Sequence, residues 1–398
     1  MPRIVIIGAG PAGLNLFQAL AKQLSPADDT EVVVFEKSKY YYHAVGTPRA
    51  YTEEAFAKML FIPYDNAIPT NARSFVRIVR AVVTSIAGDK NEVSYRTVRD
   101  SDDQLSATTE TLAFDSLVIA TGSTYTVPIK PDSQQVARSH TESKLKEVHD
   151  QIAAAQKILI VGGGAVGCEV AGDIASKYPQ KQVTILESRE QLVAGNNVRD
   201  KFRNNVKASL ERMKVKVIVG ERLEERLTGN SFTKRTLRTN KGTEIESDIQ
   251  LLCGGFSPVG ELVREMDPAL VDDRGFVKVN AMLQLDDPKY HHMFALGDVS
   301  NHATPKLAYW AGEQGKHLAK ELVATIRKRQ SAVVNAYPPV KVEACILPLG
   351  PNGGVSQLPL FGGLVVGNFV TRLFKAKDMF AGMTWKGLGA TAPQWTSS

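Results

Sequence analysis

The chain has 398 residues, 43% of them apolar, and a formal net charge of +6. This length exceeds what one hydrophobic core usually supports, so we expect two or three domains. The apolar fraction is that of an ordinary globular protein, and the absence of any uninterrupted apolar run of about 20 residues excludes a transmembrane helix.

The cysteines exclude further classes of protein, and the net charge has two interpretations. Cys168, Cys253 and Cys345 lie far apart in sequence, so a disulfide scaffold, a zinc site and a redox-active dithiol lack support. The positive charge indicates either a solvated basic surface or attraction to anionic lipid or nucleic acid. The first residues do not read as a signal peptide, and Pro2 excludes N-terminal myristoylation, so we expect a cytoplasmic protein.

The chain opens with the pattern of a βαβ unit. Residues 4–7 form a short apolar run typical of a buried parallel strand, residues 12–24 repeat apolar side chains at helical spacing, and residues 31–35 predict a second strand. A glycine motif, residues 8–13, lies between the first strand and the helix. This order is typical of a dinucleotide-binding unit.

Each glycine of this motif has an expected task. Gly8 makes a tight turn, Gly10 lets the backbone approach a pyrophosphate, and Gly13 lets the helix pack on the strand. Glu36 ends the second strand, where a carboxylate can bind both ribose hydroxyls. The helix N-terminus adds free N–H groups and partial positive charge. The further residues expected to contact this dinucleotide are Pro11, Ala12 and Lys37.

A second glycine motif repeats the arrangement about 150 residues later. Residues 157–161 predict a strand, residues 165–177 a helix and residues 182–186 another strand. The motif between the first two elements has its glycines at Gly162, Gly164 and Gly167, and the matching acid is Glu187. That carboxylate would repel a 2′-phosphate, which favours NADH, although Arg189 is either a surface side chain or a phosphate ligand and leaves NADPH open.

Two weaker strands, residues 117–122 and 249–255, each follow a glycine motif, and residues 294–298 end another strand in Gly-Asp. Residues 306–327 predict a long helix, and beyond Tyr337 the composition shifts to Gly, Leu, Val and Phe. We therefore expect an α/β fold with two Rossmann-like domains and a small α+β C-terminal segment. The expected boundaries are 1–125 with 256–330 for FAD binding, 126–255 for NAD(P)H binding and 331–398 for the C-terminal segment.

The order of the two glycine motifs, the Ala-Thr-Gly turn and Gly297-Asp298 resembles that of the two-dinucleotide-binding-domain flavoproteins. The resemblance implies FAD in the first site and NADH or NADPH in the second. It also implies that Asp298 binds the ribityl chain, unless this residue is only a cap. The other cofactor contacts that it implies are Ala120, Thr121, Gly122, Gly297, Lys306, Leu307 and Ala308.

A narrower resemblance rests on residues 304–312, 120–124 and 375–380 together with Trp385-Lys386. These segments are similar to the ferroptosis suppressor protein family, also named after an apoptosis-inducing-factor-homologous mitochondrion-associated inducer of death, from Ile4 to about Lys386. The resemblance implies an FAD-dependent NAD(P)H:quinone oxidoreductase related to type II NADH dehydrogenases. It implies contact with a membrane, the mitochondrial outer surface or a lipid droplet.

The same resemblance implies four catalytic side chains: His43, Glu169, Lys375 and Phe380. Each has a plainer interpretation. His43 is otherwise a loop residue in an aromatic cluster, Glu169 a helix cap, Lys375 one member of a basic run, and Phe380 a core residue. No metal ion is expected.

The sequence does not decide the electron acceptor or the binding partners of the protein. Besides a quinone, molecular oxygen would suit a flavin oxidase or monooxygenase, and relatives of apoptosis-inducing factor include DNA-binding pro-apoptotic flavoproteins. Residues 358–361 and 364–374 place apolar side chains beside basic ones, which suits peripheral membrane contact or a lid packed on the FAD domain. No specific nucleic acid is expected, and the sequence does not decide the oligomeric state.

Overall fold

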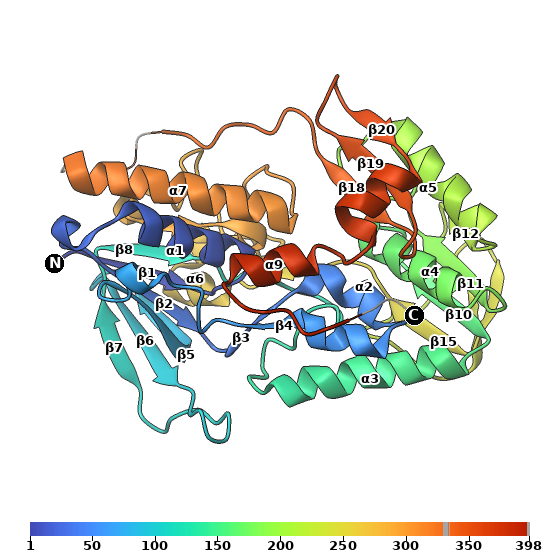
Figure 1. Cartoon of the computed structure of the whole chain (residues 1–398), viewed down its shortest axis with the longest axis horizontal. Helices are drawn as coiled ribbons and strands as arrows, with labels where there is room; N and C mark the ends of the chain where they lie inside the picture. The colour runs from blue at the N-terminus through green and yellow to red at the C-terminus, as the bar shows by residue number, and fades with distance from the viewer. Residues whose placement is uncertain (329–332, 334, 396–398) are drawn as a thin grey trace.

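The computed structural model describes residues 1–328, 333 and 335–395. A larger, mixed sheet and a smaller, parallel sheet lie at opposite ends of an elongated molecule, with the C-terminal segment between and above them (Figure 1). The expected boundary at 330–331 falls outside the described residues. The domain boundaries stay a prediction, but they assign the two sheets to different units.

The larger sheet has seven strands in the order β17-β8-β1-β2-β5-β6-β7. Its first five strands are parallel, and β6 and β7 are antiparallel additions at one edge. The strands are β1 (Arg3–Ile7), β2 (Glu31–Glu36), β5 (Val76–Ala87), β6 (Glu92–Thr97), β7 (Glu110–Ala113), β8 (Ser116–Ile119) and β17 (Met293–Ala295). Along β1, Ile4 and Ile6 face one apolar cluster while Val5 and Ile7 face another, so both faces are covered.

Two helices cover one face of this sheet. α1 (Pro11–Gln23) and α7 (Ala308–Lys328) lie side by side (Figure 1). Their backbones approach closely, because a Cβ placed on Gly315 would lie 2.4 Å from the carbonyl oxygen of Ala12. The packing of α7 on α1 therefore fixes the position of the N-terminus of α1 relative to the sheet.

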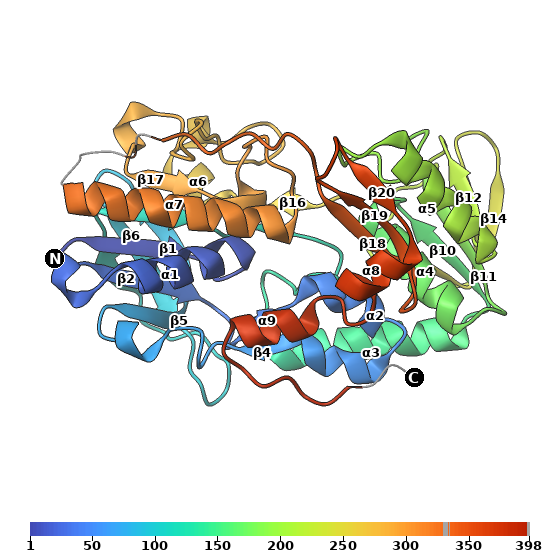
Figure 2. The ribbon, with the colours of Figure 1, turned by 45° about the horizontal axis from the view of Figure 1, so that its top comes forward.

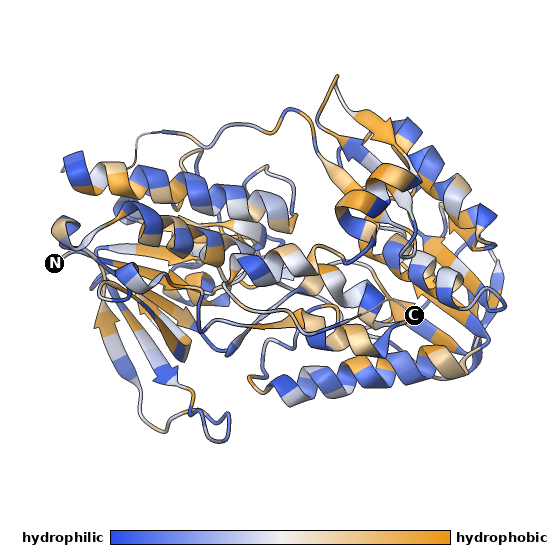
Figure 3. Cartoon of the chain, in the orientation of Figure 1, coloured by the Kyte–Doolittle hydropathy of each residue, from blue (hydrophilic) through white to orange (hydrophobic). Residues whose placement is uncertain are grey.

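The smaller sheet has four parallel strands in the order β12-β11-β10-β15. They are β10 (Lys157–Val161), β11 (Gln182–Glu187), β12 (Lys216–Val219) and β15 (Ile249–Leu252), and the helices beside them are α3 (Arg138–Ala154), α4 (Ala165–Lys177) and α5 (Asp200–Arg212). Apolar residues mark the strands of both sheets and polar ones the outside of α3 (Figure 3). The hairpin β13 (Arg235–Arg238) with β14 (Glu244–Ser247) pairs separately.

The C-terminal segment contacts both halves of the molecule. It consists of the antiparallel strands β18 (Cys345–Pro348), β19 (Gly354–Leu358) and β20 (Leu364–Val366), helix α8 (Asn368–Thr371), a π-helical turn at Arg372–Ala376 and helix α9 (Ala381–Gly387). The strands lie beside α4 and α5, whereas α9 lies beside β4 (Phe61–Pro63) (Figure 2). The Trp385 indole nitrogen donates to the carbonyl of Met59 at 2.9 Å.

The remaining short elements connect these layers. They are β3 (Tyr40–Tyr42), α2 (Thr47–Ala50), β9 (Ser123–Thr124), β16 (Ser257–Pro258) and α6 (Glu261–Met266). One apolar cluster runs from α1 through the C-terminal segment to the strands of the smaller sheet. Within the described residues, no helix combines the length and apolarity needed to cross a bilayer.

Candidate active site

The first glycine motif, with the start of α1, forms a turn that we call the first cradle (residues 8–13). Gly8 has a φ of +98°, and a Cβ there would lie 2.6 Å from the Ala120 carbonyl oxygen. A Cβ on Gly13 would lie 1.9 Å from the Gly8 carbonyl oxygen. Both positions need glycine for the fold itself, because any side chain would collide with backbone.

Gly10 differs from its two neighbours in the cradle. Its φ is −65°, an ordinary value, and a Cβ there would meet no protein atom within 4 Å. No side chain caps α1, so its first N–H groups face this open space. The space and the free donors fit a pyrophosphate, which accepts hydrogen bonds and carries the charge that a helix N-terminus favours.

Glu36 is fixed beside the cradle. Its Oε2 accepts from the Ala9 N–H at 2.8 Å and its Oε1 from the Ser38 N–H at 2.9 Å. Lys37 turns away: its ammonium donates to the carbonyls of three residues of the connection after β9, at 2.6–3.0 Å. These residues are Asp132, Ser133 and Gln135.

The second cradle (residues 162–167, with the start of α4) repeats this geometry. Gly162 has a φ of +110°, and a Cβ on Gly167 would lie 1.9 Å from the Gly162 carbonyl oxygen. Gly164 again has an ordinary φ of −71°, open space around its Cβ position and no side-chain cap on the helix. Glu187 accepts from the Gly163 N–H at 2.7 Å and the Arg189 N–H at 2.9 Å, as Glu36 does in the first cradle.

Two small-residue turns lie next to the first cradle. The Ala120 N–H donates to the Ile7 carbonyl at 2.8 Å, and the Thr121 hydroxyl donates to the Val259 carbonyl at 2.7 Å. Gly122 and Gly297 both have positive φ, at +73° and +71°, and a Cβ on Gly297 would lie 3.3 Å from that of Ala12. The turn that carries Asp298 therefore packs directly on the start of α1.

Asp298 has a partner that the sequence did not indicate. Its Oδ2 accepts from the Lys130 ammonium at 2.9 Å and the Ser123 hydroxyl at 2.8 Å. Burial acts to raise the pKa of Asp298, but Lys130 and the hydroxyl hold it below its usual value. Lys130 follows no motif and lies 168 residues from Asp298 in the chain, so no local pattern could have indicated it.

Lys306 holds the loop after Asp298. Its ammonium donates to the carbonyls of Gly297, Ser300 and His302 at 3.3, 2.7 and 3.0 Å, and burial lowers its pKa to about 8. The Leu307 N–H donates to Pro305, and Ala308 begins α7. Lys306 thus contacts backbone, and the cofactor contacts expected of residues 306–308 stay predictions.

Two of the four expected catalytic side chains, Lys375 and Glu169, are in direct contact, and the other two lie near them. The Lys375 ammonium lies 2.6 Å from Glu169 Oε1 and 3.2 Å from the Ile346 carbonyl oxygen, and only 11% of the Lys375 and 6% of the Glu169 side chain is exposed. Burial raises the pKa of Glu169 even though Lys375 opposes this. Glu169 therefore pairs with Lys375 and does not cap its helix.

Phe380 and His43 are the other two expected catalytic side chains. The Lys375 ammonium lies 6.0 Å from the centre of the Phe380 ring, and Phe380 has a φ of +63°. His43 Nε2 lies 2.7 Å from the carbonyl oxygen of Met379, so this nitrogen carries the proton and donates. His43 Nδ1 is buried and has no partner among the described residues, which leaves one acceptor for a bound molecule.

The protonation state of His43 follows from its burial. Only 3% of the residue is exposed, and desolvation lowers its pKa to about 4, more than the hydrogen bond to Met379 raises it. His43 is therefore uncharged at neutral pH. An imidazolium at this position is not available to give a proton to an acceptor.

This burial predicts a pH-dependent stability. Because the unfolded chain binds the His43 proton more tightly than the folded one, the stabilisation is complete above about pH 6.5 and is lost as pH falls towards about 4, by about 3 kcal/mol. Urea unfolding at pH 4.5 and 7.5 measures it. The pH difference should shrink in His43→Gln and stay unchanged in His291→Gln, a substitution at an exposed position. An equal pH difference in wild type and His43→Gln would contradict the prediction.

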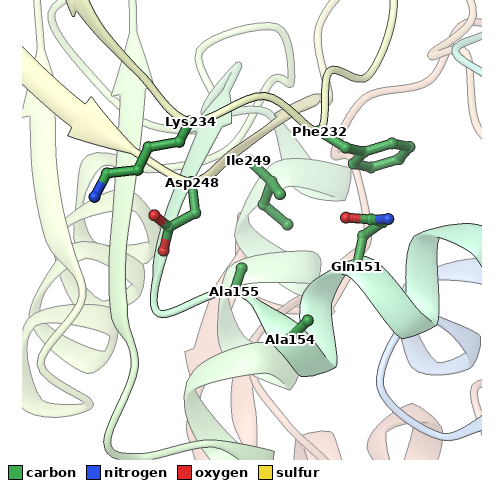
Figure 4. A pocket seen from close by; sticks show the side chains of 7 residues that line it. All are labelled: Gln151, Ala154, Ala155, Phe232, Lys234, Asp248 and Ile249. Atoms are coloured by element: carbon green, nitrogen blue, oxygen red, sulfur yellow. The ribbon is translucent and has the colours of Figure 1, made fainter.

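Two surface cavities lie away from these side chains. One cavity of about 370 Å³ lies at the end of α3 and the start of β15 (Figure 4). The second cradle lies at the other end of the smaller sheet, where β10 ends. The carboxylate of this cavity, Asp248, accepts from the N–H groups of Gln156 and Lys157. A smaller one of about 170 Å³ is lined by Ser38 and Tyr40, next to Glu36.

The cysteines do not supply a dithiol in the described residues. All three are free and buried. Burial raises the pKa of Cys253 and Cys345 to about 12, and burial followed by the neighbouring Glu169 raises that of Cys168. Protonated, buried thiols are poor nucleophiles.

Comparison with known proteins agrees with this architecture. The family described as pyridine nucleotide-disulphide oxidoreductase matches residues 2–315. Ferroptosis suppressor protein 1 from Homo sapiens is 30% identical, and the match covers 98% of this chain and 96% of that protein. The structure of the sulfide:quinone oxidoreductase from Aquifex aeolicus has a TM-score of 0.75 at 16% identity, covering 99% of this chain and 93% of the other. The water-forming NADH oxidase from Lactobacillus brevis, bound to NADH, has a TM-score of 0.63 at 19% identity, covering 90% and 75%.

Proposed function

This chain belongs to the pyridine nucleotide-disulphide oxidoreductase family and, within it, to the family of ferroptosis suppressor protein, and from that membership we propose that it is an NAD(P)H:quinone oxidoreductase. Its cofactors are FAD and NAD(P)H. The observation that carries the proposal is the pair of open cradles at Gly10 and Gly164, combined with three inert thiols. Because the chain offers no dithiol relay, this proposal has a diffusible acceptor meeting the flavin directly.

Bound FAD would supply two-electron redox chemistry between a reduced nicotinamide and the second substrate. The chain contributes binding and orientation. The free N–H groups of α1 would hold the FAD pyrophosphate, Glu36 would bind its ribose, and Asp298 would bind the ribityl chain. The N–H groups of α4 and Glu187 would bind the pyrophosphate and ribose of the nicotinamide dinucleotide in the same way, and Glu187 would favour NADH because it would repel a 2′-phosphate.

The proton balance supports a proton-donating task for Lys375, with water as the alternative source. Reduction of a quinone by NADH takes up one proton from solution: NADH + H⁺ + quinone gives NAD⁺ + quinol. Because His43 is neutral and its Nε2–H donates to Met379, the buried Lys375–Glu169 pair or water is the remaining source of that proton. Phe380, beside Lys375, supplies an aromatic face against which a quinone ring can stack.

A steady-state comparison tests the proposal. NADH and NADPH are each offered with a panel of quinones, in air and without oxygen. We expect a yellow protein whose NADH consumption rises several-fold with quinone and continues without oxygen. Oxygen-dependent consumption that quinone does not stimulate would overturn the quinone assignment and favour an oxidase.

The C-terminal segment also supports contact with a membrane surface. Seven large apolar side chains between residues 360 and 383 are exposed, Phe361 by 91% and Phe369 by 81%. We call these seven the apolar C-terminal face: Leu360, Phe361, Leu364, Phe369, Leu373, Phe374 and Met383. The exposed basic side chains Arg372 and Lys377 lie among them in sequence and Lys386 follows shortly after, and this combination suits an anionic lipid surface.

Removing part of this face should release the protein from lipid. Replacing Phe361, Phe369 and Leu373 together by serine is expected to weaken binding to anionic liposomes at least about tenfold. Burying one aromatic or leucine side chain in the lipid contributes about 1.5–3 kcal/mol to binding. Co-sedimentation measures the binding. Tyr309→Ser, at an exposed aromatic on α7, is the control. Equal binding by the triple variant would contradict the membrane contact.

A further inference from the structure

Arg49 joins three parts of the molecule that are far apart in sequence. Its Nε donates to Asp173 Oδ1 on α4 at 2.9 Å, and its Nη2 donates to the Ala376 carbonyl at 3.0 Å. The Arg49 side chain is 0% exposed and that of Asp173 is 1% exposed. Arg49 belongs to α2, which lies beside α4. One guanidinium therefore connects the FAD side, the NAD(P)H side and the C-terminal segment.

The Ala376 carbonyl is available because the helix around it is irregular. Residues 372–376 form a π-helical turn, in which the Lys377 N–H reaches back five residues to Arg372. In a continued α-helix the Phe380 N–H would reach Ala376, but it donates to Asp378 Oδ1 at 3.1 Å. Arg49 supplies the missing donor. It thereby holds the residue that follows Lys375.

The partners of Arg49 and Lys375 lie one helical turn apart. Asp173 and Glu169 occupy positions i+4 and i on α4, so the two buried carboxylates share one face of the helix and repel each other. Each receives one cation: Lys375 from the C-terminal segment and Arg49 from α2. Burial raises the pKa of Asp173, and Arg49 opposes this.

Stability alone is a weak explanation for this ion pair. Arg49 Nη1 and Asp173 Oδ2 are buried without a hydrogen-bond partner in the described residues, so the pair is incompletely satisfied. Buried ion pairs of this kind are often no more stabilising than apolar residues of similar volume. What an apolar pair would not reproduce is the directed hydrogen bond to Ala376.

We propose that Arg49 is the positioning residue of the active site, holding the π-helical turn on α4 so that Lys375 stays on Glu169. The inference deepens the proposed function and rests on it for the role of Lys375. Arg49 touches neither substrate nor cofactor in this role. Its effect on turnover passes through the backbone at Ala376.

Two variants of the holoenzyme test this assignment. Arg49→Met combined with Asp173→Leu removes both charges together and avoids an unpaired buried carboxylate, so it should fold with full FAD content. Arg49→Lys keeps the charge, but one ammonium cannot reproduce the geometry of the guanidinium towards both partners. The matched control is Arg327→Met with Asp28→Leu, which removes an ion pair at 2.9 Å on the surface of α7.

Hydrogen exchange and kinetics are the readouts. In both Arg49 variants we expect amide exchange in residues 375–381 to accelerate at least about tenfold, and kcat to fall at least about tenfold with the KM for NADH nearly unchanged. The control should match wild type in both. Unchanged exchange in residues 375–381 of a folded Arg49 variant would overturn the inference, as would normal kcat. The exchange experiment uses no acceptor, so failure of the quinone assignment leaves this result interpretable.

Discussion

A Gly10→Val variant is expected to fold and to purify without FAD. The backbone at Gly10 is in a conformation open to any residue, and a Cβ there meets no protein atom within 4 Å, so valine costs the apoprotein only about 1 kcal/mol as a poorer helix cap. Its side chain, however, fills the space in front of the α1 N–H groups. A pyrophosphate then loses both its room and its hydrogen bonds, and FAD affinity should fall at least about a hundredfold.

Absorbance of the purified protein and titration with added FAD measure this effect, and thermal unfolding of the apoprotein checks the fold. Gly13→Ala is the contrasting variant. Its Cβ would lie 1.9 Å from the Gly8 carbonyl oxygen, so it should destabilise the fold by about 3 kcal/mol or more. A Gly10→Val protein that retains stoichiometric FAD would show that the first cradle does not hold the pyrophosphate.

The second large effect concerns Gly164. A Gly164→Val protein should stay yellow, because the first cradle is intact, while NADH without oxygen should no longer bleach the flavin band within seconds. The geometry matches that of Gly10, with an ordinary φ and no atom within 4 Å of the Cβ position. We expect kcat/KM for NADH to fall at least about a hundredfold, since the donor loses its pyrophosphate contacts.

Anaerobic stopped-flow reduction measures this directly, and dithionite provides the control, because it reduces flavin without the second cradle. The Gly164→Val protein should bleach normally with dithionite. Reduction by NADH at the wild-type rate would refute the assignment of residues 162–167 to the nicotinamide dinucleotide.

The two cradles and the class of fold could be predicted from sequence because their signals are local. A strand, a glycine turn, a helix and an acid follow one another within about 30 residues, and each part has a short-range physical reason. The motif also predicted different tasks for Gly10 and Gly13. The structure adds the distances: a Cβ on Gly13 would lie 1.9 Å from the Gly8 carbonyl oxygen, whereas a Cβ on Gly10 would meet no protein atom within 4 Å.

The candidate catalytic residues could be predicted only from the resemblance to the ferroptosis suppressor protein family. His43 and Met379 are 336 residues apart, and Glu169 and Lys375 are 206 apart, so no periodicity connects them. Arg49 and Lys130 were missed altogether, since a buried arginine in a short helix and a lysine in a connection carry no motif. The catalytic roles of the four residues stay predictions, although the structure pairs Lys375 with Glu169 and His43 with the backbone of Met379.

The late position of the C-terminal segment has a consequence for synthesis of the protein. Met379, Lys375 and the Ala376 carbonyl complete contacts with residues that leave the ribosome more than 200 positions earlier. Until these last residues emerge, the nascent polypeptide exposes His43 and Arg49 to water and lacks the partner of Glu169. A premature stop codon after α7 and before position 375 would therefore leave two glycine cradles but no assembled catalytic centre.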